Sequence, residues 1–319
     1  MEINKRITEK YCSQQHDVLP PFPTKNLLIE VTNYCNNKCV FCYNQYMQRQ
    51  KAFIDEKICI KALLEAYDLG CREVGFYVTG EPLLNKKLEK YIAEAKKIGY
   101  DYIYITSNGI LATLDRVIGL YEAGLNSIKF SINAYNKENY KKINGTDNYY
   151  KVVKNLNDVY TWKKQNNIDI NVFASFITTK YTNDLKKIEE TFFEMCDKII
   201  IQPAINQGGL LPKTICDISD GSINNFLLPC SYPFESVIVT VEGYVTACCM
   251  DFENLLAYGN LNIDSFEEIW KNKIIQTLRK KHLDNDLGGT ICDNCINNSK
   301  NVPMPIEKKL CFNKNIYIK

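Results

Sequence analysis

The run VTNYCNNKCVFCYNQ, residues 31–45, decides how this chain is interpreted, because it carries three cysteines on one short loop. Cys35, Cys39 and Cys42 are separated by three residues and then by two, and they follow the apolar run NLLIEVT, residues 26–32. Three thiolates can hold three irons of a 4Fe-4S cube and leave the fourth iron without a protein ligand. Such an iron is open to a substrate. The motif therefore predicts a reactive iron–sulfur site directly after a first strand.

A structural zinc site is the alternative interpretation of these thiols. Structural zinc usually takes four protein ligands from CxxC or Cys/His sets. His16 lies well upstream and the next cysteine, Cys59, lies in a helix-like stretch, so no fourth ligand is nearby. The spacing in this context favours the iron–sulfur cluster.

Composition and charge narrow the class of protein. The 319 residues allow one large domain with an appendage. Lys and Arg number 39 against 37 Asp and Glu, a formal net charge of +2, which argues against nucleic acid as a partner. Because no signal peptide or membrane-spanning run is present, we expect a cytoplasmic protein without a membrane partner. Fourteen cysteines in a reducing compartment then indicate metal or redox chemistry.

The order of β-rich and helical runs predicts an α/β fold with a parallel sheet. Helical patterns follow the first five of six β-rich runs, as right-handed crossovers require. The apolar character of these runs suggests strands covered on both faces. Periodicity alone does not distinguish a partial barrel from an open doubly wound sheet. The six runs are residues 26–32, 73–79, 102–107, 127–133, 168–178 and 198–204.

The region beyond the last β-rich run reads as a smaller second module. A stretch rich in Gly, Asn, Ser and Asp precedes a hairpin pattern with Glu242 and Gly243 at its turn. A helix capped by Asp264 or Ser265 follows. We expect four parts: a leader at 1–25, a barrel at 26–205, a bridge at 206–228 and a cysteine-bearing module at 229–319.

The cysteine loop after a first strand, with the aromatic Tyr43 beside Cys42, closely resembles the radical S-adenosylmethionine (SAM) superfamily. The resemblance implies a partial (β/α)6 TIM-like barrel with reactive loops at the C-terminal ends of its strands. It also implies that the open iron chelates SAM, which one electron from the cluster cleaves to a 5'-deoxyadenosyl radical.

The same resemblance implies where SAM is held. Gly80, Glu81 and Pro82 in VTGEPLL resemble the family's GGEP turn, which supports the methionyl amino group of SAM. Thr79 replaces the first glycine, and we expect this to be tolerated because the contacts come from the backbone and Glu81. Without the family context, the GEP turn and the Asn108–Gly109 pair would be ordinary turns and Ser131 an ordinary strand-end residue. Further implied SAM contacts are Tyr43, Ser107, Asn108, Ser131 and Asn133.

Four later cysteines predict a second metal site. Cys230 and Cys248 flank the hairpin pattern, and Cys292 and Cys295 form a CxxC motif. Four thiolates close the shell of a second cluster, and four-cysteine zinc is the alternative. With AYGNLN and SFEEIW between them, these cysteines resemble the shortened SPASM or twitch domain of aminoglycoside-pathway dehydrogenases and epimerases. Residues 296–310 contain no cysteine, so we expect one auxiliary 4Fe-4S cluster.

Two residues after Cys248 are candidates for direct chemistry. If the strand alternates, Cys249 points away from its liganding neighbour and could give a hydrogen atom to a substrate radical, as in related epimerases. Asp251 could act as a base in an oxidation. The plain alternatives are a small buried thiol and a turn residue. Whether Cys216, Cys249 or Cys311 replaces one of the four auxiliary ligands is open at this point.

The expected function is a radical SAM oxidoreductase or epimerase that takes hydrogen from a small polar substrate. The substrate class would be a sugar, aminocyclitol or nucleotide-sugar, since about 25 residues before the barrel are too few for a peptide-leader domain. A flavodoxin- or ferredoxin-type protein would donate electrons. Two alternatives are a peptide- or protein-modifying maturase and a non-catalytic iron–sulfur electron carrier, which would not need the GEP turn.

Overall fold

The computed structural model describes residues 16–182, 184–211, 228–297 and 299–310. Cys12, Cys216 and Cys311, most of the expected bridge and residues 1–15 of the expected leader lie outside this range.

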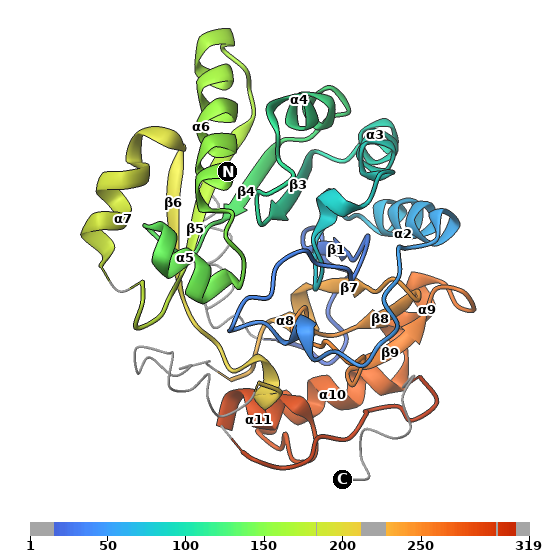
Figure 1. Cartoon of the computed structure of the whole chain (residues 1–319). Coiled ribbons are helices and arrows are strands. Elements are labelled where there is room, and N and C mark those ends of the chain that lie inside the picture. Colours follow the sequence, from blue (N-terminus) through green and yellow to red (C-terminus); the bar gives the residue numbers. More distant parts are fainter. Residues whose placement is uncertain (1–15, 183, 212–227, 298, 311–319) are drawn as a thin grey trace.

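One nine-stranded sheet organises the chain, in the order β6-β5-β4-β3-β2-β1-β7-β8-β9. Neighbouring strands from β1 to β6 all pair in parallel and curve into a partial barrel (Figure 1). This confirms the predicted α/β fold class. The first six strands are β1 (Leu27–Ile29), β2 (Glu73–Gly75), β3 (Tyr102–Ser107), β4 (Ser127–Ser131), β5 (Asn171–Thr178) and β6 (Lys198–Pro203).

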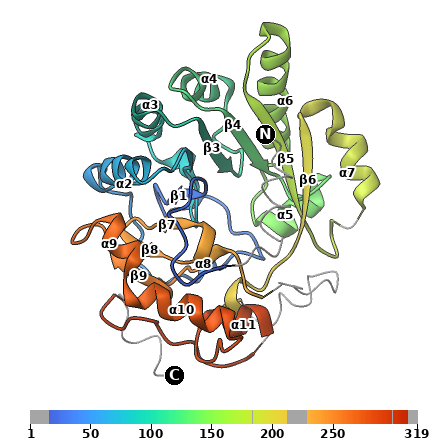
Figure 2. The ribbon, with the colours of Figure 1, turned by 180° about the vertical axis from the view of Figure 1, so that it is seen from behind.

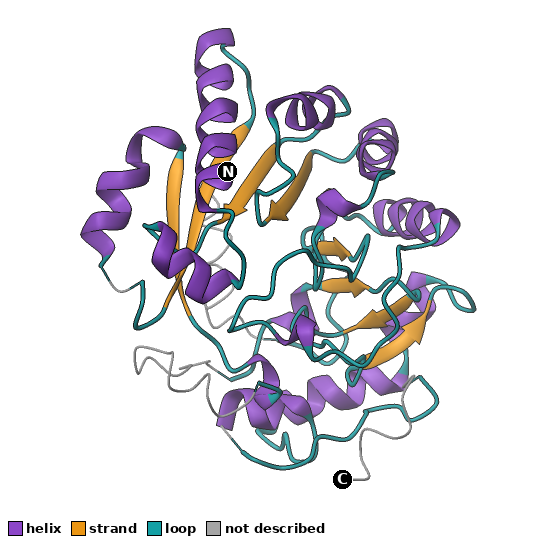
Figure 3. Ribbon diagram, viewed as in Figure 1, coloured by secondary structure: helices purple, strands orange, loops and turns teal. Residues whose placement is uncertain are grey.

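Helices cover the outer side of these strands (Figure 3). Local caps begin several of them: the side chain of Asp55 accepts from Lys57 N at the start of α2, and that of Thr113 accepts from Arg116 N at the start of α4. The helix α5, which the sequence pattern did not predict, follows β4. The barrel helices are α2 (Glu56–Asp68), α3 (Leu88–Ile98), α4 (Leu114–Glu122), α5 (Lys137–Asn144), α6 (Tyr149–Asn166) and α7 (Leu185–Phe192). Short 3-10 turns are η1 (Tyr43–Gln45), η2 (Pro82–Leu84), η3 (Phe193–Met195) and η4 (Gln207–Gly209).

The C-terminal part continues the barrel sheet. Strand β7 (Val237–Val239) pairs in parallel with β1, while β8 (Tyr244–Thr246) and β9 (Ala257–Asn260) complete an antiparallel extension. Gly243, at φ +84°, makes the predicted hairpin turn. Figure 2 shows the remaining helices gathered beside this extension. They are α8 (Tyr232–Glu235), α9 (Phe266–Lys271), α10 (Lys273–Leu283) and α11 (Ile291–Asn297).

The two faces of the barrel strands differ in character. On the outer face, Ile103, Ile128 and Val172 are fully buried in the main hydrophobic core that the helices cover. The inner face carries Tyr102, Thr106, Lys129 and other polar residues, because it faces the barrel interior and no helix layer. The helices therefore cover the outer face of β3 and β4, whereas the sequence pattern suggested strands covered on both faces. In the described part of the chain, no helix is long and apolar enough to cross a membrane.

Candidate cofactor and active site

The cysteine loop lies between β1 and α2, and backbone contacts hold it against the end of α5. Lys38 N donates to Asn144 O at 3.1 Å, and Val40 N donates to Ile143 O at 2.8 Å. The Cys39 thiol donates to Asn144 Oδ1 at 3.4 Å. The helix missed from sequence therefore supports the loop that carries the first three thiols.

The three thiols of this loop interact strongly with one another. Burial raises the pKa of Cys39 well above its ordinary value, and the thiolates of Cys42 and Cys35 raise it further. Burial likewise raises the pKa of Cys42 to about 11, while the ammonium group of Lys51 opposes that shift. Three mutually repelling buried thiolates fit a site completed by a positively charged group such as an iron–sulfur cluster.

Lys51 was missed by sequence reasoning, since a single lysine in a polar loop carries no motif. Its ammonium group donates to Asn33 O at 2.9 Å and to Asn44 O and Oδ1 at 3.1 and 2.9 Å. These contacts place one cation close to the cysteine loop.

The described side chains do not form a preassembled site for a single metal ion. Within the described residues, no three His, Cys, Asp or Glu side chains converge closely enough to hold one metal ion. A cube binds each thiolate at a different iron, so its ligands surround the cluster. The assignment of Cys35, Cys39 and Cys42 as ligands stays a prediction.

Glu81 joins the turn after β2 to the end of β3. Its carboxylate accepts from Ser107 Oγ at 2.8 Å, from Leu83 N at 3.0 Å and from Asn108 N at 2.7 Å. Burial nevertheless raises its pKa to about 7. The turn lies directly against the cysteine loop, because a Cβ at Gly80 would collide with the carbonyl oxygens of Thr32 and Tyr34.

Asn108 connects this turn to the cysteines. Its Nδ2 donates to Asn36 Oδ1 at 2.6 Å and lies 4.0 Å from Cys35 Sγ. Glu81 from the GEP turn and Ser107 and Asn108 from the end of the third β-rich run are thus brought together beside the loop. Pro82 begins η2 immediately after Glu81.

The other predicted SAM contacts have different surroundings. Asn133, in the left-handed region at φ +62°, accepts from Ile177 N and donates to Asn144 Oδ1. Ser131 Oγ accepts from Ser175 Oγ at 3.5 Å. Tyr43 packs edge-on against Phe252 with ring centroids 5.8 Å apart, so its ring contacts the C-terminal module.

The four cysteines predicted for the auxiliary cluster interact electrostatically although they come from two distant segments. Burial raises the pKa of Cys292 well above its ordinary value, with further increases from Cys230 and Cys295. Burial and then Cys230 raise the pKa of Cys295 to about 12. The pKa of Cys248 is raised first by a hydrogen bond with Cys249 and by burial, and Cys230 adds a smaller increase. Cys230 is therefore within electrostatic reach of all three other thiols, as one shared cluster requires.

Cys249 packs in a second group of buried side chains with Leu28, Tyr104 and Ile238. Leu28 of β1 is in register with Ile238 of β7 and with Gly75 of β2, and Gly75 is in register with Tyr104 of β3, so the three side chains lie on one face of the sheet. That face is the inner one, because the residues next to them in sequence belong to the main core beneath the helices.

The Cys249 thiol also interacts with the predicted auxiliary ligands, because it is hydrogen-bonded to Cys248 and lies within electrostatic reach of Cys295. The thiol also forms a hydrogen bond with Tyr232.

Asp251 is 2% exposed and is engaged by the chain itself. Its carboxylate accepts from Thr246 Oγ1 at 2.5 Å, from Leu255 N at 2.7 Å and from Leu256 N at 2.8 Å. These three donors hold the segment between β8 and β9. The contacts are those of a turn residue, the alternative weighed from sequence.

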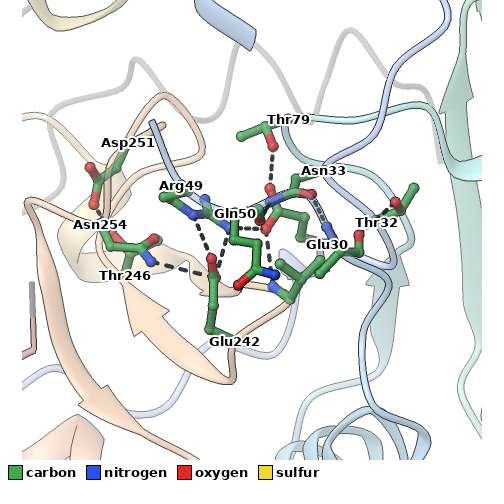
Figure 4. A network of polar contacts seen from close by, with 12 residues as sticks. Glu30, Thr32, Asn33, Arg49, Gln50, Thr79, Glu242, Thr246, Asp251 and Asn254 are labelled. Atoms are coloured by element: carbon green, nitrogen blue, oxygen red, sulfur yellow. Dashed lines mark hydrogen bonds and ion pairs between the residues drawn. The ribbon is translucent and has the colours of Figure 1, made fainter. Parts of the chain in front are cut away.

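A buried ionic network was missed entirely by sequence reasoning. Arg49 donates to Glu30, the residue directly after β1, and to Glu242 in the hairpin turn (Figure 4). Thr79 donates its hydroxyl to the same Glu30, and Val241 N donates to Glu30 Oε2 at 3.0 Å. Thr79, which replaces a family glycine, thus has a side-chain role that the backbone argument did not foresee.

Two protein-family models match this chain, one over the barrel and one over the C-terminal part. The model of the radical SAM superfamily matches residues 29–197, and that of the SPASM iron–sulfur cluster-binding domain matches residues 230–296. A probable GTP 3',8-cyclase from Saccharolobus islandicus is 22% identical over 290 residues, covering 79% of this chain and 92% of the relative. The GTP 3',8-cyclase of Chlorobaculum tepidum is 32% identical over 130 residues, 40% of this chain and 38% of the relative.

Solved structures share the fold at low identity. BtrN in complex with AdoMet and 2-DOIA has a TM-score of 0.57 at 20% identity, over 89% of this chain and 96% of BtrN. Streptococcus suis SuiB bound to precursor peptide SuiA has a TM-score of 0.64 at 14% identity, over 81% of this chain and 67% of SuiB. Family membership implies a SAM-binding 4Fe-4S cluster and auxiliary iron–sulfur chemistry. Since the first family model spans more than half of the chain, this protein belongs to the radical SAM superfamily and is an enzyme with a C-terminal SPASM domain.

Proposed function

We propose that this enzyme is an epimerase that inverts a carbon centre in a small polar molecule of the sugar, aminocyclitol or nucleotide-sugar class. The observation that carries the proposal is the position of Cys249. It directly follows the auxiliary ligand Cys248 but packs with Leu28, Tyr104 and Ile238 on the inner face of the barrel. A thiol there is placed to meet a substrate held inside the barrel.

The alternative reaction, oxidation, needs a base at the same place. Asp251 was the candidate, and its two carboxylate oxygens already accept three hydrogen bonds from Thr246, Leu255 and Leu256. Burial raises the pKa of Asp251 above its ordinary value despite these bonds, but both carboxylate oxygens are occupied within the turn, so neither is left to face a substrate. The geometry therefore favours hydrogen return by a thiol over proton removal by Asp251.

The proposal gives the predicted residues distinct roles. Within the barrel of residues 26–205, Cys35, Cys39 and Cys42 hold the first cluster. In the module of residues 229–319, which follows the bridge of residues 206–228, Cys230, Cys248, Cys292 and Cys295 hold one auxiliary 4Fe-4S cluster. The SAM contacts come from Gly80, Glu81, Pro82, Ser107, Asn108, Ser131 and Asn133, with Tyr43 at the edge of the loop.

The reaction balances with an external reductant. When bound, the cluster and SAM supply a 5'-deoxyadenosyl radical that removes a hydrogen atom from the substrate carbon. Cys249 then donates its hydrogen atom to the opposite face, so one S–H bond breaks and one C–H bond forms with inverted configuration. An electron from a flavodoxin- or ferredoxin-type donor and a proton from water restore the thiol.

The names of similar proteins bear on the substrate in two ways. The GTP 3',8-cyclases are named for a nucleotide, and BtrN was solved with the small molecule 2-DOIA. SuiB was solved with a precursor peptide. The polar inner face supports the small-molecule class, and a peptide substrate is an outcome that the following experiment can return.

The test is turnover in deuterated water with candidate sugars, aminocyclitols and nucleotide-sugars. We expect wild type to release 5'-deoxyadenosine and to place one solvent deuterium at an inverted carbon. Cys249→Ala should still release 5'-deoxyadenosine without inversion, and Cys59→Ala, which removes a buried thiol behind the sheet, should behave as wild type. The same assay is run with candidate peptides. Unchanged inversion in Cys249→Ala, a ketone product, or solvent deuterium incorporated into peptides alone would overturn the proposal.

A further inference from the structure

A short segment after β6, residues 206–209, contacts both predicted cluster sites. It consists of the turn η4 and the residue before it, and it lies against α11, the helix that carries the CxxC motif (Figure 1). Asn206 Nδ2 donates to Asn294 O at 3.0 Å and to Cys295 O at 3.4 Å. The 206–209 segment is therefore attached to the auxiliary motif through the backbone of α11.

The packing of the 206–209 segment on α11 is tight. A Cβ at Gly209 would lie 2.9 Å from the Cβ of Asn294, and a Cβ at Gly208 would lie 3.3 Å from Cδ1 of Ile291. Gly208 also forms a backbone hydrogen bond with the Cys295 thiol. Because no space separates the two elements at these points, a displacement of α11 displaces the 206–209 segment with it.

The side chain of Gln207 reaches the loop of the first cluster. Its Oε1 accepts from Tyr43 N at 2.8 Å, across 164 positions of sequence. Tyr43 directly follows the predicted ligand Cys42, so this bond holds the peptide group that joins them. Gln207 is buried, as a glutamine with a hydrogen-bonded side chain can be. Four consecutive residues thus link the first cysteine loop to the auxiliary CxxC motif.

The backbone of this turn directs the Gln207 side chain. Gln207, Gly208 and Gly209 have φ values of +49°, +72° and +72°, all in the left-handed region. Glycine adopts this region readily, whereas glutamine is unfavourable there. The contacts on both sides of Gln207 maintain the conformation, and its side-chain bond to Tyr43 N is the contact made with the first loop.

These contacts give a physical route by which the auxiliary site acts on the first loop. When Cys295 is not held by a cluster, α11 is less firmly fixed, and the packing transmits its displacement to the 206–209 segment. A shift of the Gln207 oxygen removes the acceptor of Tyr43 N, and losing a hydrogen-bond partner is unfavourable. The loop is then less well positioned beside Cys42, where the first cluster must be held for SAM to bind.

We propose that Gln207 is a positioning residue that couples the two cluster sites, so that an intact auxiliary site strengthens SAM binding at the first. The inference rests on the cluster ligands of the proposed function and does not depend on epimerisation. Because binding free energies are reciprocal, SAM bound at the first site also stabilises the auxiliary site.

The test is a double-variant cycle on the full chain, reconstituted anaerobically with iron and sulfide and studied without substrate. The dissociation constant of SAM is measured with and without Cys295→Ala in wild type and in three variants of Gln207. Gln207→Gly and Gln207→Asn suit the left-handed backbone but do not reach Tyr43 N, whereas Gln207→Glu keeps an oxygen at the same reach. Gln276→Asn is a matched control, because it shortens an exposed glutamine whose Nε2 donates to Lys271 O at 2.7 Å.

We expect Cys295→Ala to weaken SAM binding about tenfold in the otherwise wild-type chain. Gln207→Gly and Gln207→Asn should each bind SAM about as weakly as Cys295→Ala does, and adding Cys295→Ala should then change the dissociation constant by less than about twofold. Gln207→Glu should retain most of the coupling, and Gln276→Asn should match wild type. At a fixed SAM concentration, the EPR spectrum of the reduced first cluster should show a smaller SAM-bound fraction in the two short variants.

Two results overturn the inference. One is unchanged SAM binding in Cys295→Ala, and the other is a tenfold effect of Cys295→Ala that persists in both Gln207→Gly and Gln207→Asn. Should Cys295→Ala fail to fold, Cys292→Ala breaks the same site and provides the same comparison.

Iron content separates failure of the coupling from failure of the ligand assignment. About four irons in Cys295→Ala with unchanged SAM binding would contradict only the coupling. About eight irons retained in Cys295→Ala would overturn the ligand assignment and the coupling together. The epimerase proposal fails separately, if no substrate is inverted while the coupling is present, because SAM binding is measured without substrate.

Discussion

Arg49 and Glu242 form a bidentate ion pair, with Nε 2.9 Å from Oε1 and Nη2 2.8 Å from Oε2. Arg49 belongs to the segment that leads from the cysteine loop to α2, and Glu242 lies in the hairpin turn of the C-terminal module (Figure 4). Glu30 is fully buried and also accepts from Arg49. A planar guanidinium held by two carboxylates fixes both position and angle, so this pair sets the hairpin relative to the first cluster loop.

Removing Arg49 should destabilise the protein strongly. Arg49→Met leaves the carboxylate of Glu30 buried without its cation, and we expect a loss of about 3–5 kcal/mol in the free energy of unfolding. Arg49→Lys keeps the charge without the bidentate geometry and should lose less. Urea denaturation of the cluster-free protein measures both values.

Lys271→Met is the matched control for Arg49, because Lys271 pairs with Glu267 on the exposed surface of α9. An exposed pair of this kind contributes about 0–1 kcal/mol. Equal losses of unfolding free energy in Lys271→Met and Arg49→Met would mean that the buried network stabilises the protein no more than an exposed ion pair does.

Glu81 should make stability depend on pH in a defined direction. Burial raises its pKa from 4.5 to about 7, although three hydrogen bonds oppose the shift. Since the folded-state pKa lies above the unfolded one, the protonated carboxyl stabilises the fold fully below about pH 4.5. That contribution is lost as the pH rises through about 7.

The variant Glu81→Gln isolates this effect, because it keeps the shape of the side chain and cannot titrate. The difference in free energy of unfolding between wild type and Glu81→Gln should fall between about pH 5 and 8 and then become constant. Other titrating groups, such as the buried His282 with its pKa lowered to about 4, cancel in the difference. A difference that stays flat over this range would show that Glu81 is not perturbed.

Replacing an auxiliary cysteine should remove one cluster and spare the other. We expect about eight irons per reconstituted wild-type chain and about four in Cys230→Ala. Cys71→Ala should keep all of them, because Cys71 is fully buried in the main hydrophobic core. Iron, sulfide and zinc analysis with absorbance spectra measures the change. A colourless protein with stoichiometric zinc would reject the iron–sulfur assignment at both sites.

The sequence was sufficient wherever the determining pattern is local. The x3 and x2 spacing of Cys35, Cys39 and Cys42 indicated the family, and alternation of β-rich and helical runs predicted six parallel strands. Gly243 marked the hairpin turn through its need for positive φ. Thiol spacing, turn chemistry and periodicity all act over a few residues, so they can be read without the fold.

Only the tertiary structure decided which polar side chains share a partner. Asp251 resembles a catalytic base in sequence, yet folding directs two backbone amides and a hydroxyl to its carboxylate. Arg49 meets Glu242 across 193 positions, and Lys129 is placed beside Tyr77 by strand register. Such contacts depend on chain closure over long separations, which no local pattern encodes, and on the side of each strand that turns inward.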